Sequence, residues 1–346
     1  MSEETKEYDR LGTARRLGAR GEFEAEEKAV NAALEAEPYS IPATIAKGDC
    51  RARAGDNELA AFFYRQARAF GRARRLSSDE TRALEHAGSR LRSIEENGAA
   101  AREARLAERG LPPASWSPRL RHALDLAAGK RRPYAQRPTS FFYPELPQVQ
   151  FYDPGQFAWA ATIENAAADI AAELAALLRE GTDGFRPYIQ SDVASVPGEA
   201  NAALLGKKDW SVLALCENGW LSPDLIRRCP RTWEAVLQAP VPRVSGWGPT
   251  ITFSLLKAGA HIAAHTGMVN TRLICHLPLI VPPGCRFRVG NELREWQVGK
   301  LLIFDDTIEH EAWNDGGEDR VVLIFDIWRP ELSERERHEL TALFSD

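Results

Sequence analysis

Four of the seven histidines, His261, His265, His276 and His310, fall within about 50 residues of the C-terminal half. A single histidine among strands is usually a hydrogen-bonded structural residue, but four so close together indicate a site. Two local contexts carry this interpretation: an HTG sequence begins at His265, and an EHE sequence surrounds His310. Because iron(II) accepts imidazole nitrogens readily, these residues are candidate metal ligands.

The strand that follows the HTG sequence would present arginine and histidine together. Side chains alternate across a strand, so Arg272, Ile274 and His276 are predicted to share one face. A face that offers arginine and histidine beside an otherwise apolar sheet is a candidate wall of a binding site. For Arg272 and His276 the alternative is an ordinary structural hydrogen bond.

A further arginine follows the EHE sequence. The DGG sequence at 315–317 is a hairpin signal, and a turn there would make His310 and Arg320 neighbours across the hairpin. Arginine holds carboxylates in a two-pronged arrangement. A histidine beside an arginine would therefore suit a metal ligand next to an anion clamp.

The elements that must position these residues are predicted to be strands. Beyond Lys208 the chain consists of short apolar runs such as ITFSLL, KLLIFD and RVVLIFDIW, bounded by Gly, Pro, Asn and Asp. Such spacing favours a sandwich or barrel, of which the jelly roll is a common form. Helices are expected on either side: an alanine-rich one over 154–180, and a C-terminal one that begins at a capping box of Ser333 and Glu336.

The first 110 residues are rich in Ala, Arg and Glu, with apolar residues at helical spacing. Gly21 and Gly55 lie 34 residues apart, and small or apolar residues around them recur at the same distance, which is the period of tetratricopeptide repeats. A third, less regular unit is expected over 78–111, with Gly88 near its turn. The alternative is a plain helical bundle. Stacked helix pairs of this kind often bind peptides on a concave surface.

Prolines punctuate residues 111–154 and predict a linker packed on a neighbouring domain, with one short helix near 118–129. We therefore expect a tetratricopeptide-like domain over 1–110, this linker over 111–154, and a jelly-roll domain over 155–346. The fold class is α+β, with an all-α N-terminal domain and a double-stranded β-helix flanked by helices.

The composition excludes several classes of protein. A net charge of −5 argues against nucleic-acid binding, and no apolar run approaches the length of a membrane span. The charged start, MSEETKEYDR, lacks the apolar core of a secretory signal, and the five cysteines form no CxxC pair. These features predict a cytoplasmic protein with reduced thiols.

Residues 208–332 resemble the catalytic domain of the aspartyl/asparaginyl β-hydroxylases, which are iron(II)- and 2-oxoglutarate-dependent dioxygenases. The matching stretches are, in order, DWSVLALCENG, FSLLKAGAHIAAHTG, NTRLICHLPLIVPPGCRFRVG, GKLLIFDDTIEHEAWN and VVLIFDIWRPELS. The helical first part is also similar in kind to the tetratricopeptide region that precedes this domain in some relatives.

The resemblance implies that His265 and His310 are the iron ligands. Most 2-oxoglutarate oxygenases add a carboxylate through an HxD element. Here the corresponding position is Gly267. The family is known for this omission, which leaves more coordination positions for 2-oxoglutarate, water and oxygen.

The resemblance also implies how the cosubstrate binds. Arg320, helped by the hydroxyl of Ser254, would hold the distal carboxylate of 2-oxoglutarate, and His276 would lie near its iron-chelating end. Arg272 would lie on the same wall, close to a carboxylate of the substrate or cosubstrate. Ile274 stands where the family usually has a second arginine, so one charge that could hold an acidic group is missing.

The sequence therefore predicts an enzyme that uses Fe(II), 2-oxoglutarate and O2. The expected reaction adds a hydroxyl group to the β-carbon of an Asp or Asn residue of a peptide or protein, which the helical repeats could hold. One alternative is the same chemistry on a small molecule, a carrier-bound amino acid or a lipid acyl chain. Another is a non-catalytic tetratricopeptide adaptor with a ligand-binding β domain.

Overall fold

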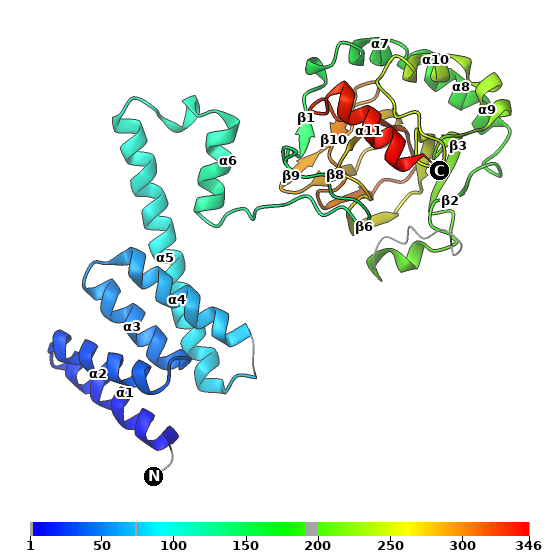
Figure 1. The fold of residues 1–346 in the computed structure, drawn as a ribbon. Helices are drawn as coiled ribbons and strands as arrows, with labels where there is room; N and C mark the ends of the chain where they lie inside the picture. The colour runs from blue at the N-terminus through cyan, green and yellow to red at the C-terminus, as the bar shows by residue number, and fades with distance from the viewer. Residues whose placement is uncertain (1–2, 73–74, 191–198, 346) are drawn as a thin grey trace. The chain divides into compact units, whose positions relative to one another are not determined.

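The computed structural model describes residues 3–72, 75–190 and 199–345, and the chain divides into two compact units, 1–132 and 133–346. The first unit is all-α and the second is built on antiparallel sheets, as Figure 1 shows, so the predicted fold class is confirmed. The segment expected to be a linker, 111–154, is divided between the two units.

The first unit repeats a helix pair at the predicted spacing. Its helices are α1 (Glu3–Ala19), α2 (Phe23–Ala36), α3 (Ile41–Arg53), α4 (Asn57–Arg72), α5 (Ser78–Glu108) and α6 (Pro118–Ala127), with a 3-10 turn, η1, at Pro113–Ser115. Gly21 and Gly55 follow the first helix of each pair, with φ of 78° and 80°. Glycine adopts this left-handed conformation without strain, so the two glycines mark the same turn in both repeats.

The third repeat expected over 78–111 does not form, and that prediction was wrong. Gly88 lies inside α5, an uninterrupted helix of 31 residues, instead of at a turn. A glycine within a helix costs only about 1 kcal/mol, which the surrounding Ala, Arg and Glu residues offset. A capping box of Ser77 and Glu80 begins the helix, and Leu91 buries one face of it against the α3–α4 pair.

The second unit contains two antiparallel sheets. The larger has the order β1 (Phe151–Tyr152), β10 (Leu302–Phe304), β7 (Arg272–Ile280), β12 (Arg320–Trp328), β5 (Ile251–Leu256), β3 (Trp210–Glu217) and β2 (Arg186–Pro187), with β4 (Trp220–Leu221) paired to β3. The smaller has the order β6 (His261–His265), β11 (His310–Asn314), β8 (Cys285–Val289) and β9 (Glu292–Arg294). Apolar residues from both sheets share one core, which makes the predicted double-stranded β-helix.

The period of two in the strands decides which side chains face the smaller sheet. On β12, Val322 lies in the core between the sheets, whereas Leu323 and Phe325 lie in a second core on the opposite face. Helices α7 (Ala160–Asn165), α8 (Ala167–Arg179) and α10 (Pro230–Val236) cover that opposite face (Figure 1). The remaining helical segments are η2 (Pro154–Gln156), η3 (Glu199–Leu204), α9 (Pro223–Arg228) and α11 (Glu334–Phe344).

The single helix expected over 154–180 is divided into η2, α7 and α8. Phe157 adopts an extended backbone after η2 and packs its ring against the core, which interrupts the helix. The predicted capping box of Ser333 and Glu336 does begin α11. No helix within the described ranges is long and apolar enough to cross a membrane.

Candidate active site

His265 and His310 lie side by side in the smaller sheet, at the end of β6 and the start of β11. They are direct cross-strand partners of β6 and β11, and their ring centroids are 4.1 Å apart. The ring of His310 also contacts Phe304 of the larger sheet, at 5.6 Å between centroids. The strand pairing therefore brings together two histidines that are 45 positions apart in the sequence, on the face that looks toward the larger sheet.

Backbone carbonyl groups hold both imidazole rings in the same way, through Nδ1. His265 Nδ1 lies 2.8 Å from the carbonyl oxygen of Ala263, and His310 Nδ1 lies 3.1 Å from that of Ile308. A carbonyl accepts only, so each Nδ1 carries the proton and each Nε2 keeps its lone pair. Burial lowers the pKa of both rings, that of His310 furthest, so both are neutral.

A buried carboxyl group lies beside the histidine pair. A Cβ built at Gly267 would overlap the Asp306 carboxyl, so glycine is required there, and Gly267 N donates to the Asp306 backbone oxygen at 2.7 Å. Asp306 Oδ1 is buried with no hydrogen-bond partner in the described part of the chain. Burial raises the pKa of Asp306 to about 7. Nothing in the local sequence relates Asp306 to Gly267, which lies 39 positions away.

Arg320 is a buried cation without a counter-ion. Arg320 is 1% exposed, and no carboxylate among the described residues pairs with it. Its Nε is buried and unbonded, its guanidinium lies 4.5 Å from the centre of the Trp296 ring, and burial lowers its pKa to about 10. A cation held in this way is prepared for an anionic ligand.

The predicted hairpin between His310 and Arg320 was wrong. The chain leaves β11 of the smaller sheet and enters β12 of the larger one, so the turn after Asn314 crosses between sheets. Asn314 holds this crossing by donating to the carbonyl oxygens of Leu256 and Glu318, at 3.0 and 2.8 Å. The two residues therefore belong to opposite walls of one core instead of one ladder.

Ser254 and His276 lie on the same wall as Arg320. In the larger sheet Ser254 is opposite Val322 and His276 is opposite Ile324, so both share the inner face of β12 with Arg320. Burial and the nearby Arg320 charge lower the pKa of His276 well below its ordinary value, which keeps this ring neutral as well. The structure thus brings together three of the residues expected to contact 2-oxoglutarate.

Arg272 occupies the predicted face but is already paired. Its Nη1 donates to Asp326 Oδ2 at 3.1 Å, and the two residues lie on the neighbouring strands β7 and β12. Burial alone would lower the pKa of Arg272, but the charges of Asp326 and Asp306 raise it. Ile274, directly opposite Asp326, leaves the adjacent surface apolar. Arg272 therefore has only part of its hydrogen-bonding capacity left for a ligand, including a buried, unbonded Nε.

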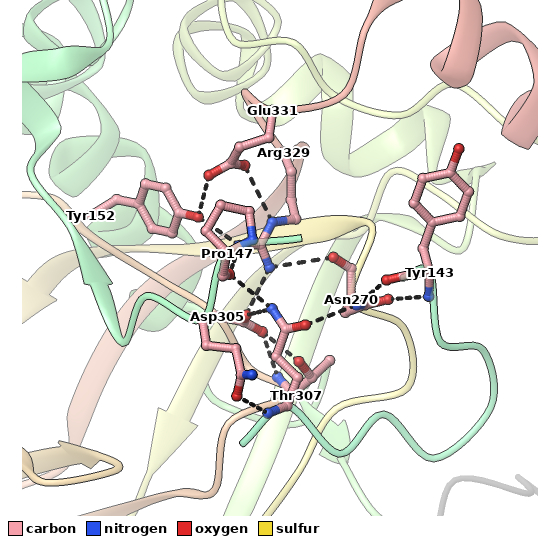
Figure 2. Close-up of polar contacts among 10 residues, drawn as sticks. Tyr143, Pro147, Tyr152, Asn270, Asp305, Thr307, Arg329 and Glu331 are labelled. Atoms are coloured by element: carbon pink, nitrogen blue, oxygen red, sulfur yellow. Dashed lines mark hydrogen bonds and ion pairs between the residues drawn. The ribbon is translucent and has the colours of Figure 1, made fainter. Parts of the chain in front are cut away.

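A buried ion pair, Arg329 with Asp305, holds the loop that carries Asp306 (Figure 2). Arg329 Nη1 donates to Asp305 Oδ2 at 2.7 Å, and Gln136 Nε2 donates to the same oxygen at 2.6 Å. Asp305 Oδ1 accepts from the backbone N–H and the hydroxyl of Thr307, at 3.0 and 2.6 Å, so Asp305 also caps this turn. Nothing in the sequence indicated the pairing with Arg329, 24 positions away.

These groups could hold a metal ion and an acidic ligand together. Two neutral imidazoles offer Nε2 lone pairs from one wall, and an unpaired guanidinium faces them from the other. Over the described ranges no group of three or more His, Cys, Asp or Glu residues is arranged around a common point, so the protein would supply two ligands. A pair of imidazole ligands that leaves further coordination positions open is compatible with iron(II), so these two histidines could bind that metal.

Residues 164–330 match the family model for aspartyl/asparaginyl beta-hydroxylase, so the predicted resemblance is confirmed. Aspartyl/asparaginyl beta-hydroxylase of Homo sapiens is 38% identical over 139 residues, which cover 40% of this chain and 18% of that protein. Ornithine lipid ester-linked acyl 2-hydroxylase of Rhizobium tropici is 38% identical over 192 residues, which cover 54% of this chain and 63% of that protein. The chain thus matches less than two thirds of the length of either relative.

Among solved structures, a predicted oxalate decarboxylase of Thermotoga maritima is similar at a TM-score of 0.23 and 12% identity, over 35% of this chain and 81% of that one. The match to the family model includes every residue discussed above as a candidate ligand or anion contact. The stretch that is similar to this family therefore includes the histidine pair and Arg320.

Proposed function

We propose that this chain, whose residues 164–330 form an aspartyl/asparaginyl beta-hydroxylase domain, is an iron(II)- and 2-oxoglutarate-dependent hydroxylase. The observation that carries the proposal is the combination of a neutral His265/His310 pair with the unpaired Arg320 on the facing wall. The first offers two ligands to a metal ion, and the second offers a partner to a dicarboxylate.

Bound iron(II), with 2-oxoglutarate and oxygen, would supply the oxidising power to hydroxylate an unactivated carbon, with succinate and carbon dioxide as co-products. The chain's own residues do the remaining work. His265 and His310 would hold the metal through Nε2, and their backbone hydrogen bonds fix both rings before it binds. Arg320, with Ser254 and His276, would bind and orient the cosubstrate, and the rings of Phe287 and Phe304 would exclude water.

The substrate we favour is an Asp or Asn residue of a peptide or protein, hydroxylated at its β-carbon. The name of the human relative supports this choice. The all-α unit would serve such a substrate, because a segment bound on helical repeats has a raised effective concentration at a linked active site. Comparing full-length protein with residues 133–346 on a long and a short substrate tests this role.

A second candidate, hydroxylation of a lipid acyl chain or another neutral substrate, has its own support. Arg272 is already paired with Asp326, and Ile274 leaves the neighbouring surface apolar, so an acidic target would find few free cations. The name of the Rhizobium relative agrees with this candidate.

The decisive experiment measures succinate released from 2-oxoglutarate. With iron(II) and oxygen the protein should release succinate, whereas His310→Ala and a chelator-treated sample should not. Release equal to that of the mutant would contradict the proposal and favour a non-catalytic, ligand-binding domain joined to an adaptor. Parallel reactions with Asp peptides, Asn peptides and acyl lipids then identify the substrate by the mass of one added oxygen atom.

A further inference from the structure

We propose that Trp210 and Trp296 are positioning residues, whose indole N–H groups make Ser254 and His276 hydrogen-bond donors toward an acidic cosubstrate. This inference rests on the proposed function for its ligand, 2-oxoglutarate. Its structural part, the direction of two hydrogen bonds, can be tested without any ligand.

Trp296 decides which nitrogen of His276 carries the proton. Its Nε1 lies 3.3 Å from His276 Nδ1. An indole nitrogen donates and cannot accept, so His276 Nδ1 must be the acceptor in this contact. In a neutral ring the proton then belongs to Nε2, which makes no hydrogen bond with any of the described residues. His276 therefore presents a donor, not a lone pair, to the space that remains.

The same protein thus contains neutral histidines in opposite tautomers. His265 and His310 donate from Nδ1 to backbone carbonyl groups and keep a lone pair on Nε2, which is the form a metal ion binds. His276 accepts at Nδ1 and keeps a proton on Nε2, which is the form a carboxylate binds. The difference comes from one donor-only neighbour, because all three rings have a lowered pKa and are neutral.

Trp210 acts on Ser254 in the same way. Its Nε1 donates to Ser254 Oγ at 3.2 Å, and both side chains are buried. A hydroxyl that accepts here directs its own hydrogen elsewhere, and Ser254 Oγ makes no other hydrogen bond within the described part of the chain. The serine is therefore also set as a donor.

The strand register gathers these donors on one surface. Ser254 on β5 is opposite Val322 of β12, and His276 on β7 is opposite Ile324, so both lie on the inner face that carries Arg320. The ring of Trp296 also lies under the Arg320 guanidinium, at 4.5 Å. Three donors from adjacent strands, without an acceptor among them, match an oxygen-rich dianion.

The first test is the tautomer of His276 in the metal-free, full-length protein. Nitrogen-15 NMR distinguishes a protonated from an unprotonated ring nitrogen, and a His276→Gln sample assigns the signal. We expect protonated Nε2 and bare Nδ1 for His276, and the reverse for His265 and His310. A protonated Nδ1 in His276 would overturn the inference, and the measurement itself is made on the wild-type protein.

The second test uses Trp296→Phe and Trp210→Phe, which keep an aromatic ring but remove the N–H together with part of the indole ring. Trp313→Phe, on the outer face of the smaller sheet where it stacks on His261, is the matched control. We expect the dissociation constant for 2-oxoglutarate, measured with iron(II) under anaerobic conditions, to rise roughly tenfold in each of the first two variants. Trp296→Phe should also give a mixed population of His276 tautomers.

These outcomes separate the inference from the proposed function. If the wild type binds 2-oxoglutarate and both variants bind it equally well, the inference fails while the function stands. If the wild type does not bind 2-oxoglutarate at all, the proposed function fails, and the NMR result still decides whether Trp296 sets the tautomer.

Discussion

Replacing Arg320 with methionine should stabilise the protein and abolish its affinity for 2-oxoglutarate. The two effects have one cause, because the fold buries a cation that only the ligand neutralises. Methionine fills a similar volume without charge, so the change tests the charge more than the packing.

The magnitude follows from the pKa of Arg320, which burial lowers to about 10. A tenfold change in a protonation equilibrium corresponds to about 1.4 kcal/mol, so holding this cation in the fold costs roughly 3 kcal/mol. Because the pKa is lower in the folded state than in the unfolded state, the cost is fully present at every pH below 10 and disappears only above the unfolded value. The contact with the Trp296 ring offsets about 1–2 kcal/mol, so Arg320→Met should gain about 1–2 kcal/mol at pH 7.

The matched control is Arg329→Met, which removes the other fully buried arginine of this unit. Arg329 is paired with Asp305 and donates to the Pro147 carbonyl at 2.6 Å, so its loss leaves a buried carboxylate without its cationic partner. Breaking such a pair typically destabilises a protein by about 3–5 kcal/mol. The two substitutions should therefore change the free energy of unfolding in opposite directions.

Urea unfolding followed by tryptophan fluorescence measures this, since every tryptophan except Trp116 lies beyond Arg132. The same proteins are titrated with 2-oxoglutarate, whose affinity for Arg320→Met should fall by about two to three orders of magnitude. If Arg320→Met were destabilised as much as Arg329→Met, Arg320 would have a structural anion partner and the reasoning would be refuted. An unchanged affinity would identify another clamp, with Arg272 the first to examine.

Three further predictions concern the metal side of the site. His265→Ala and His310→Ala should each lower iron(II) affinity at least tenfold and leave the far-UV circular dichroism unchanged, whereas equal affinity in a competition titration would remove that residue from the ligand set. Gly267→Ala should lower the free energy of unfolding by about 1–3 kcal/mol, because its Cβ would overlap the Asp306 carboxyl, and an unaffected unfolding midpoint would mean that this carboxyl moves freely. In metal-free protein, the free energy of unfolding should fall as the pH rises from 4 to 7, and this fall should be absent in Asp306→Asn. The reason is that burial raises the pKa of Asp306 in the folded state to about 7, so the folded state binds a proton that the unfolded state has already lost. Identical pH profiles of urea midpoints for wild type and Asp306→Asn would contradict that assignment.

Local features of the chain are determined by the sequence itself. The turns at Gly21 and Gly55 repeat because only glycine adopts their φ values without strain, and a 34-residue spacing is visible in any self-comparison. The shared face of Arg272 and His276 follows from the period of two in a strand, and the register confirms it. The capping box at Ser333 is similarly local, because its two partners are three positions apart.

What connects distant segments was decided only by the tertiary structure. The sequence around Asn314 predicts a hairpin, yet β12 pairs with β5 and β7, where its two faces pack into two different hydrophobic cores. The pairs Arg272–Asp326 and Arg329–Asp305 join residues 54 and 24 positions apart. The local sequence around a charged residue does not indicate which distant residue it will pair with. Which arginine stays unpaired, and which histidine nitrogen carries the proton, depends on the neighbours that strand pairing supplies. The residues of the site can therefore be identified from the sequence. Their charge states and hydrogen-bond directions follow from burial and from contacts that only the fold creates.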